Sequence, residues 1–244
     1  MLAAGRGVRI RGSELVPKPL MKLGGRPLLA RTLDALQAAG IERVVVVLGY
    51  MAEDVRTVLA GHTWPGMSVQ TVFNPAYEKS NGLSVLAASP DAGGRFILVM
   101  SDHLLDSRII SMALESDPGD GTLLCVDRKL DRVFDMSDAT KVLTQDGLIR
   151  DIGKSLAEYD AVDTGVFHCT TALSAAIRDI AARTGDCSVT AGMQALAARG
   201  LARAADIGPL LWQDVDTGEM LEEAGRRLSL IEANEDAAAH RVRQ

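Results

Sequence analysis

Over the first hundred positions, segments with apolar residues at helical spacing alternate with short apolar runs typical of strands. Leucines recur every three or four residues between Pro27 and Gly40, a spacing that predicts one helix with its start and stop marked. The β-branched run Arg43–Leu48 is typical of a strand that is buried on both faces. The elements predicted next are, in order, helix Ala52–Ala60, strand Ser68–Phe73, helix Leu83–Ala88 and strand Arg95–Met100. This alternation predicts an α/β domain with a mostly parallel central sheet and helices on both faces.

Short strands dominate the second half of the chain. They are predicted at Leu123–Val126, Ala139–Thr144, Leu148–Ile152 and Ala161–Cys169. Asp146-Gly147 lies between two of them and favours a hairpin turn. The remaining elements are helices Ala172–Ala182 and Thr190–Arg199, strand Ala202–Ile207 and helix Gly218–Ile231. We therefore expect one Rossmann-like domain over residues 1–231 with an inserted β-rich subregion, followed by a polar, frayed tail over residues 232–244.

The start of the chain is unusual for this architecture. A glycine loop in a doubly wound domain should follow a buried first strand, but only Met1 and Leu2 precede Ala3-Ala4-Gly5. Two interpretations follow: the first strand is very short, or the true start lies upstream. The second is the favoured expectation.

Composition narrows the classes of protein. Of 244 residues 47% are hydrophobic and 24% charged, which is typical of a soluble globular protein. The net charge of −6 gives no broad basic surface for nucleic acid or an anionic membrane. Cys125, Cys169 and Cys187 form no CxxC pair, so neither a zinc knuckle nor a disulfide framework is supported. The longest apolar stretch, Val44–Leu48, is too short to span a membrane, and no signal peptide is recognised, so we expect a cytoplasmic protein.

An anion-binding loop is the first candidate for chemistry. The segment Leu2–Arg9 combines small residues, two glycines and two arginines. Exposed backbone N–H groups in such a loop form a concavity for anions, and arginine adds paired donors. An ordinary turn with surface arginines fits equally well. Lys18 between Pro17 and Pro19 favours the anion site, because a lysine with little backbone freedom can meet a phosphate in a fixed geometry.

Three aspartates are candidate metal ligands. Asp102 ends a buried strand, where open α/β sheets place ligands. Asp214 and Asp216 are two residues apart, so in an extended segment both face one side. Mg²⁺ typically takes one or two protein carboxylates together with waters and substrate phosphates. Turn or cap roles are the alternative for single strand-end aspartates.

Several motifs carry a family resemblance. LAAGRGVR followed by PKPLMKLGGRPLLARTLDAL resembles the opening of the sugar-phosphate nucleotidyltransferases, the MobA-like NTP transferases. The resemblance continues through the segments Asn74–Tyr77, Ser80–Ser84, Ser101–His103 and Trp212–Thr217. The stretches Ala139–Val142, Ile152–Lys154 and Val162–Phe167 are most similar to the CTP:inositol-1-phosphate cytidylyltransferases. This resemblance implies a single nucleotidyltransferase domain that makes CDP-inositol and pyrophosphate from CTP and inositol 1-phosphate with Mg²⁺.

The resemblance also implies a role for each matching residue. Arg9 and Lys18 would be catalytic, Asp102 and Asp216 would hold Mg²⁺, and Asp214 is a reserve ligand. The implied nucleotide-binding residues are Leu2, Ala3, Ala4, Gly5, Gly7, Asn81 and Gly82. The implied acceptor-binding residues are Lys141, Lys154, Asp163, Thr164 and Gly165. Taken without the family, Asn81 reads as a helix N-cap and the two lysines as strand-edge charges.

Other functions stay open from the sequence. The nearest alternative is another nucleotidyltransferase of the superfamily that acts on phosphocholine or a hexose 1-phosphate. Recognition of phosphocholine calls for an aromatic cage around its quaternary ammonium, but only 4% of the residues are aromatic. A molybdenum-cofactor guanylyltransferase, a glycosyltransferase and a catalytically silent nucleotide-binding homologue are further alternatives. His103 beside Asp102 invites a metal or acid–base role, but an ionised phosphate needs no general base, so packing is expected. Coupling to a membrane CDP-alcohol phosphotransferase and a homodimer are the implied partners.

Overall fold

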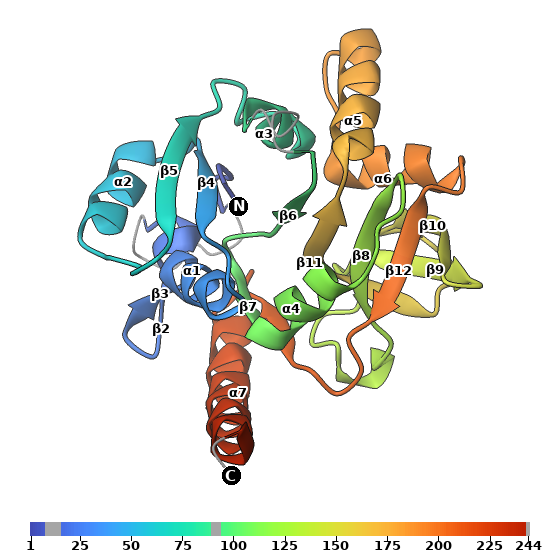
Figure 1. Cartoon of the computed structure of the whole chain (residues 1–244). Coiled ribbons are helices and arrows are strands. Elements are labelled where there is room, and N and C mark those ends of the chain that lie inside the picture. Colours follow the sequence, from blue (N-terminus) through green and yellow to red (C-terminus); the bar gives the residue numbers. More distant parts are fainter. Residues whose placement is uncertain (8–15, 89–93, 243–244) are drawn as a thin grey trace.

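In the part of the chain that the structure describes, the fold consists of short strands and seven α-helices around a divided sheet (Figure 1). The computed structural model describes residues 1–7, 16–88 and 94–242, with only the helical backbone for 235–242. The strands are β1 (Leu2–Ala3), β2 (Lys22–Leu23), β3 (Arg26–Pro27), β4 (Arg43–Leu48), β5 (Ser68–Phe73), β6 (Phe96–Leu98), β7 (His103–Leu105), β8 (Thr122–Asp127), β9 (Lys141–Gln145), β10 (Leu148–Gly153), β11 (Ala161–Cys169), β12 (Ala202–Asp206) and β13 (Trp212–Asp214). The helices are α1 (Leu28–Ala38), α2 (Ala52–Ala60), α3 (Gly82–Ala87), α4 (Ser107–Glu115), α5 (Thr171–Thr184), α6 (Val189–Ala197) and α7 (Gly218–Val242), with 3₁₀ turns η1 (Lys18–Leu20) and η3 (Leu130–Arg132).

The N-terminal half carries a parallel sheet in the order β1-β4-β5. β4 is the buried valine run predicted from the sequence, and its side chains alternate between two apolar clusters. Val44 and Val46 pack with the leucines of α1 and with α2 and α4. Val47 packs on the other face with α3 and α5. The prediction of a parallel sheet covered by helices on both faces is therefore confirmed for this half.

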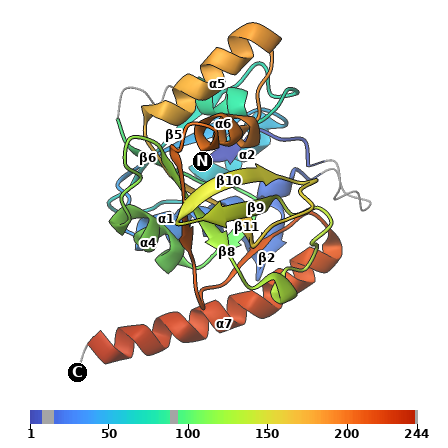
Figure 2. The same cartoon turned by 90° about the vertical axis from the view of Figure 1, so that its right-hand side faces the viewer.

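The C-terminal half carries the β-rich subregion as a mixed sheet. Its order is β6-β11-β8-β12-β10-β9, and β9 also pairs with β11, so the strands from β11 to β9 close a small barrel (Figure 2). Only β8 and β12 run parallel within it. Asp146 and Gly147 both have positive φ angles, 53° and 76°, and join β9 to β10 as the predicted hairpin.

The short strands β7 and β13, which were not predicted from the sequence, link the two halves of the fold. β7 pairs antiparallel with β13, which sets Asp214 opposite His103. α4 follows at once, and the Asp106 carboxylate caps it by accepting a hydrogen bond from the backbone N–H of Arg108. The pairing matters for function because it carries the end of the β6 segment to the C-terminal aspartates.

Helix α7 extends beyond its predicted end. It begins at Gly218 as predicted but its backbone continues to Val242, so the predicted helix end at Ile231 is wrong. The division into a domain over residues 1–231 and a tail over residues 232–244 stays a prediction. The residues after Ile231 are rich in alanine and glutamate, which are strong helix formers and favour continuation of the helix. Within the described residues, no helix is long and apolar enough to cross a membrane.

Candidate functional site

A cavity of about 220 Å³ lies where the carboxyl ends of β1 and the β6 segment meet. This is the edge at which open α/β sheets bind ligands. Its lining residues come from four separate segments: Leu2, Ala3, Ala4, Gly5, Gly7, Lys18, Pro19, Tyr77, Lys79, Asn81, Ser84, Met100, Ser101 and Asp102. The described part of the glycine loop, Lys18, Asn81 and Asp102 are thus brought to one cavity from distant parts of the chain.

Glycine at position 7 allows the loop to lie directly against Lys18. Gly7 has a φ angle of +57°, and a Cβ atom there would lie 2.6 Å from Cγ of Lys18. A side chain at this position would therefore meet both backbone strain and a clash. The loop backbone and the lysine stem form one wall of the cavity. The predicted catalytic Arg9 lies outside the described residues.

Lys18 lies between two carboxylates. Its Nζ is 3.3 Å from Oδ2 of Asp102 and forms an ion pair with Oδ1 of Asp216. The Lys18 side chain is only 13% exposed, so these charges are partly desolvated and interact more strongly than surface pairs. Lys18 begins η1 and has a proline on each side, and the φ angle of a proline is fixed by its ring. The structure therefore gathers the lysine and the two predicted metal ligands at one point.

The pKa values of Asp102 and Asp214 are shifted in opposite directions. Burial raises the pKa of Asp102, but the positive charges of His103 and Lys18 and a backbone hydrogen bond outweigh burial, so its pKa lies below the usual value. Burial raises the pKa of Asp214; the charge of His103 lowers it only in part, and the Asp102 carboxylate raises it further. Asp102 is therefore the firmly ionised member, and Asp214 retains a proton more readily.

Asp214 and Asp216 do not lie on one face of a single strand, although the spacing of two residues predicted this. β13 ends at Asp214, whose Oδ1 accepts a hydrogen bond from Gln213 Nε2 at 3.1 Å. Asp216 lies beyond the strand, between β13 and α7, where its backbone N–H faces the sulfur of Met220 at 3.2 Å. Of these two aspartates, Asp216 forms the ion pair with Lys18. The ranking of Asp216 above Asp214 as a metal ligand stays a prediction.

Asp102 and Asp216 have the donor chemistry that Mg²⁺ takes. Among the described residues, no group of three or more histidine, cysteine or acidic side chains is arranged to hold a metal unaided. Mg²⁺ binds through one or two carboxylates and completes its shell with waters and substrate phosphates. Two carboxylates that already share one cation, the Lys18 ammonium, fit that requirement.

Asn81 stands at the start of α3, but its side chain does not cap the helix. Its Oδ1 accepts a hydrogen bond from the backbone N–H of Val189 at 2.9 Å, which ties the cavity wall to α6. Gly82 is buried, and a Cβ there would lie 2.4 Å from the carbonyl oxygen of Cys187. The Gly82 backbone is therefore held by packing and does not line the cavity. A contact of either residue with a base stays a prediction.

Five cavity residues were not singled out from the sequence: Tyr77, Lys79, Ser84, Met100 and Ser101. Lys79 adds a positive group, although its Nζ donates to the carbonyl oxygen of Gly185 at 2.9 Å. Tyr77 packs so closely on Gly49 that a Cβ there would lie 2.3 Å from the tyrosine Cβ. Tyr77, Ser84 and Ser101 lie within the segments that carry the family resemblance, so the motif itself was the available signal.

Asp163 and His103 form a second polar group beside the carboxylates. Asp163 Oδ1 accepts a hydrogen bond from the Gly165 N–H at 2.7 Å, and burial raises the pKa of this carboxyl to about 6. Gly165 has a φ angle of +77°, and a Cβ there would lie 2.3 Å from the His103 ring. Within the described residues, the buried Nδ1 of His103 has no hydrogen-bond partner. The ring packs edge-on against Trp212 at 5.9 Å, which agrees with the expected packing role.

The other predicted acceptor residues have partners within the protein. Lys141 is buried, and its Nζ donates to the carbonyl oxygen of Lys154 at 2.8 Å. Lys154 Nζ pairs with Asp138 at 2.7 Å. Thr164 is fully buried and its hydroxyl donates to the Cys125 carbonyl at 2.7 Å, so that this side chain stabilises the sheet instead of facing a substrate. Phosphate neutralisation by the two lysines stays a prediction.

Replacing Asp163 with asparagine is expected to stabilise the protein above pH 6. The folded-state pKa of about 6 is above the usual 3.8, so the stability contributed by this carboxyl is present below pH 4 and lost as the pH rises through 6. A neutral amide keeps the acceptor for Gly165 and removes the buried charge. We expect the melting temperature of Asp163→Asn to exceed that of the wild type by roughly 2–6 °C at pH 8. At pH 4 the two should melt alike. The exposed Asp131→Asn is the matched control, and an equal difference at both pH values contradicts the assignment.

Comparison with known proteins gives one family match. The model of the MobA-like NTP transferase domain matches residues 1–134. That span holds β1, the glycine loop, Lys18 and Asp102, and it ends before Asp216.

Related proteins match over more of the chain. The chain is 35% identical over 230 residues to the "Bifunctional IPC transferase and DIPP synthase" of Aquifex aeolicus, covering 93% of this chain and 51% of that protein. The protein of the same name from Archaeoglobus fulgidus is also 35% identical, over 93% of this chain and 43% of the relative. The chain thus spans about half the length of the curated relatives it matches.

Solved structures agree with the fold. The inositol-1-phosphate CTP transferase from T. maritima superposes with a TM-score of 0.83 and 26% identity, covering 95% of this chain and 94% of that one. A UDP-glucose pyrophosphorylase from Acinetobacter baumanii has a TM-score of 0.71 and 17% identity, covering 92% of this chain and 90% of that one, and supports the fold alone.

Proposed function

This chain belongs to the MobA-like NTP transferase family, and from that membership we propose that it transfers CMP from CTP to inositol 1-phosphate, giving CDP-inositol and pyrophosphate. The observation that carries the proposal is the position of Lys18 between Asp102 and Asp216 beside the glycine loop. The names of the Aquifex and T. maritima relatives support the choice of substrates.

Chemically, a phosphate oxygen of the acceptor attacks the α-phosphorus of the nucleotide as the bond to pyrophosphate breaks. Positioning and charge stabilisation dominate such a reaction, because the protein has little covalent work to do. The loop N–H groups at Ala4–Gly7 hold the phosphate chain, and Lys18 donates to the α-phosphate. Two like charges about 4 Å apart repel by roughly 4 kcal/mol at an effective dielectric constant of 20, so a fixed cation between them removes a large barrier.

Asp102 and Asp216 are the residues that would hold Mg²⁺. A bound Mg²⁺ supplies positive charge to the phosphate oxygens and orients the leaving pyrophosphate. Without nucleotide, the two carboxylates and one ammonium leave an excess negative charge, which favours a second cation. Asp214, with its raised pKa, is less suited to this role and stays the reserve ligand.

The acceptor is assigned to the face formed by Asp163 and the start of β9. Asp163 offers a carboxylate oxygen to a polyol hydroxyl, which suits inositol better than a quaternary ammonium. Lys141 lies 5.7 Å from the centre of the Tyr159 ring, so this face holds one lysine–aromatic pair. One ring does not form a cage, and a polyol phosphate remains the better fit.

Pyrophosphate release over four nucleoside triphosphates, crossed with a panel of phosphorylated acceptors, tests the proposal. We expect CTP with inositol 1-phosphate to give the highest kcat/KM, at least about tenfold above any other pair. Preference for phosphocholine or a hexose 1-phosphate would retain the family and overturn the substrates. Absence of turnover with every pair, while CTP still protects the fold from heat, would favour a silent nucleotide-binding homologue.

The proposed product, CDP-inositol, would be the substrate of a second enzyme. The curated relatives combine two activities in one chain by name, and this chain spans about half of them. We include in the proposal a functional coupling to a membrane CDP-alcohol phosphotransferase, a cytoplasmic location and a homodimer. Co-purification and sedimentation measurements test the two interactions.

A further inference from the structure

The segment that leads into helix α3 is held by a turn from the other half of the chain. We call this turn, residues 185–189 between α5 and α6, the α5–α6 turn. Three consecutive residues ahead of α3, Lys79, Ser80 and Asn81, each hydrogen-bond to it, 106 to 108 residues farther along the chain. Lys79 and Asn81 line the cavity of the site, whereas none of the described residues of the turn does. The turn can therefore affect the cavity through the residues that it holds.

Asp186 is the central group of the α5–α6 turn. Its Oδ1 accepts hydrogen bonds from the backbone N–H of Ser80 at 3.0 Å and from that of Cys187 at 2.8 Å. Its Oδ2 accepts a hydrogen bond from the Ser80 hydroxyl at 2.9 Å. Hydrogen bonds to a charged acceptor are roughly twice as strong as those between neutral groups. The carboxylate therefore holds the Ser80 backbone against the turn in one arrangement.

The backbone N–H of Val189 fixes the orientation of the Asn81 side chain. A backbone N–H can only donate, so the amide atom that lies 2.9 Å from it is the oxygen of Asn81. The NH₂ end of that amide is therefore the end that can donate to a ligand in the cavity. Cytosine has an acceptor at ring atom N3, where uracil has an N–H donor, so the orientation of this amide bears on the choice of base.

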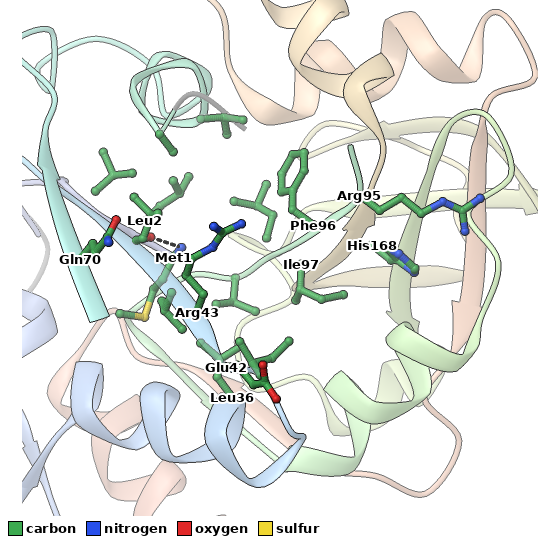
Figure 3. Close-up of a pocket in the computed structure, with 18 of the residues that line it drawn as sticks. Met1, Leu2, Leu36, Glu42, Arg43, Gln70, Arg95, Phe96, Ile97 and His168 are labelled. Atoms are coloured by element: carbon green, nitrogen blue, oxygen red, sulfur yellow. Dashed lines mark hydrogen bonds between the residues drawn. The ribbon is translucent and has the colours of Figure 1, made fainter. Parts of the chain in front are cut away.

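Helix α3 is packed closely against α5 and the α5–α6 turn. A Cβ atom on Gly82, its first residue, would lie 2.4 Å from the Cys187 carbonyl oxygen and 3.1 Å from Cγ2 of Ile177 on α5. Val85 of α3 belongs to the apolar cluster that contains Ile177 and Val189. Val85 also borders a second cavity, of about 620 Å³, which is lined by residues of β4 and β6 (Figure 3). Contacts with α5 and the turn therefore fix the place where α3 begins.

The α5–α6 turn is attached to the half of the chain that carries the proposed acceptor face. α5 follows β11, the strand of Asp163, and Thr170 caps the helix at this junction. α6 is tied to β10, because Gln194 Nε2 donates to the Ile152 carbonyl oxygen at 2.7 Å. The turn also lies outside residues 1–134, the span of the family match. A segment of the first half that faces the cavity is thus held by an element of the second half.

We propose that the α5–α6 turn positions the part of the site that meets the base of the nucleotide. Asp186 fixes the backbone of Ser80, and the Val189 N–H keeps the NH₂ end of Asn81 available to the cavity. Both are positioning residues that act through others and do not touch the substrate. This role rests on the proposed function, because it takes the base to lie beside Asn81. Affinity for the base and the choice of base depend on the turn, whereas binding of the phosphate chain does not.

Val189→Pro tests the contact with Asn81. Val189 is the first residue of α6, a position that suits proline, and Ser188 before it has the extended φ and ψ angles of −88° and 162° that a following proline requires. The variant therefore removes the N–H and retains the helix. Val189→Ala is the matched control, because it shortens the side chain and keeps the N–H. We expect the affinity ratio of CTP to UTP, measured by calorimetry with Mg²⁺, to fall at least about fivefold in Val189→Pro and less than about twofold in Val189→Ala.

Asp186→Ala tests the contact with Ser80, and inorganic tripolyphosphate serves as the ligand without a base. We expect the dissociation constant of CTP to rise at least about tenfold and that of tripolyphosphate to stay within about twofold, because Lys18 and the glycine loop are unchanged. Asp186→Asn keeps an oxygen for the two N–H donors and should restore CTP binding to within about threefold of the wild type. The exposed Asp179→Ala on α5 is the charge-matched control. In turnover, the KM for CTP should rise while kcat and the KM for the acceptor stay within about threefold.

Three results would overturn the proposal. The first is an equal loss of CTP and tripolyphosphate binding in a folded Asp186→Ala protein, because the turn would then support the whole cavity. The second is the same CTP-to-UTP ratio in Val189→Pro and Val189→Ala, a pair that decides the matter alone if Asp186→Ala does not fold. The third is equal affinity of the wild type for CTP and UTP. Calorimetry needs no acceptor, so turnover with a different acceptor, or none, would overturn the proposed substrates and leave these comparisons standing.

Discussion

Replacing Lys18 with alanine is expected to lower kcat for pyrophosphate release at least about 100-fold. The loss corresponds to about 2.7 kcal/mol of transition-state stabilisation, the usual scale for one positioned donor in a partly desolvated site. Lys18 is mostly buried and lies between Asp102 and Asp216, whereas Lys79, the other lysine that lines the cavity among the described residues, donates to the Gly185 carbonyl oxygen. The KM for CTP should rise less than kcat falls, because the loop backbone still binds the phosphate chain.

Lys22→Ala is the matched control for Lys18. Lys22 is exposed on β2, four residues along the chain, and it should retain wild-type kcat. The melting temperature of Lys18→Ala must also be measured, because removal of the ammonium leaves two carboxylates facing each other. Turnover within threefold of the wild type by a folded Lys18→Ala protein would end its assignment to the α-phosphate.

Replacing Asp102 or Asp216 with asparagine is also expected to cause a large loss of kcat. Each change removes one charge of the pair that would hold Mg²⁺, so kcat at fixed Mg²⁺ should fall at least about 100-fold. The Mg²⁺ concentration for half-maximal activity should rise together with that loss. The double variant should cost far less than the product of the single losses, because both residues act on one ion.

The exposed Asp54→Asn on α2 is the control for these two variants. Asp214→Asn tests whether the reserve ligand binds the metal. This variant should shift the Mg²⁺ dependence of kcat much less than Asp102→Asn or Asp216→Asn. An unchanged Mg²⁺ dependence in Asp102→Asn would remove the metal assignment, even if kcat falls.

Much of the fold could be predicted from the sequence because its elements have clear periods and clear ends. α2, β5 and β11 have the predicted bounds, since glycine, proline or polar residues mark their ends. The β7–β13 pairing could not be predicted, because each strand has three residues and the partners are far apart in the chain. The end of α7 was missed for another reason: helix propensity without an apolar face leaves no periodic signal.

The site was predictable where a motif fixes the backbone. Lys18 and Asp102 line one cavity, as the glycine loop and the strand end indicated. Side-chain partners were not predictable. The amide of Asn81 bonds to Val189 and the hydroxyl of Thr164 bonds inside the sheet, and neither partner is near in sequence. A motif gives the place of a residue, whereas its hydrogen bonds depend on whatever the folded chain brings beside it.

The position of α7 has a mechanical consequence. Arg227 on this helix donates to the carbonyl oxygen of Trp212 on β13 and to that of Arg132 on η3, each at 2.7 Å. The strand that precedes Asp216 is thereby clamped from behind by a helix that projects from the body of the molecule (Figure 1). Asp216 lies between this clamped strand and the start of α7 at Gly218, so we expect the position of the helix to set the distance between the Asp216 carboxylate and Lys18.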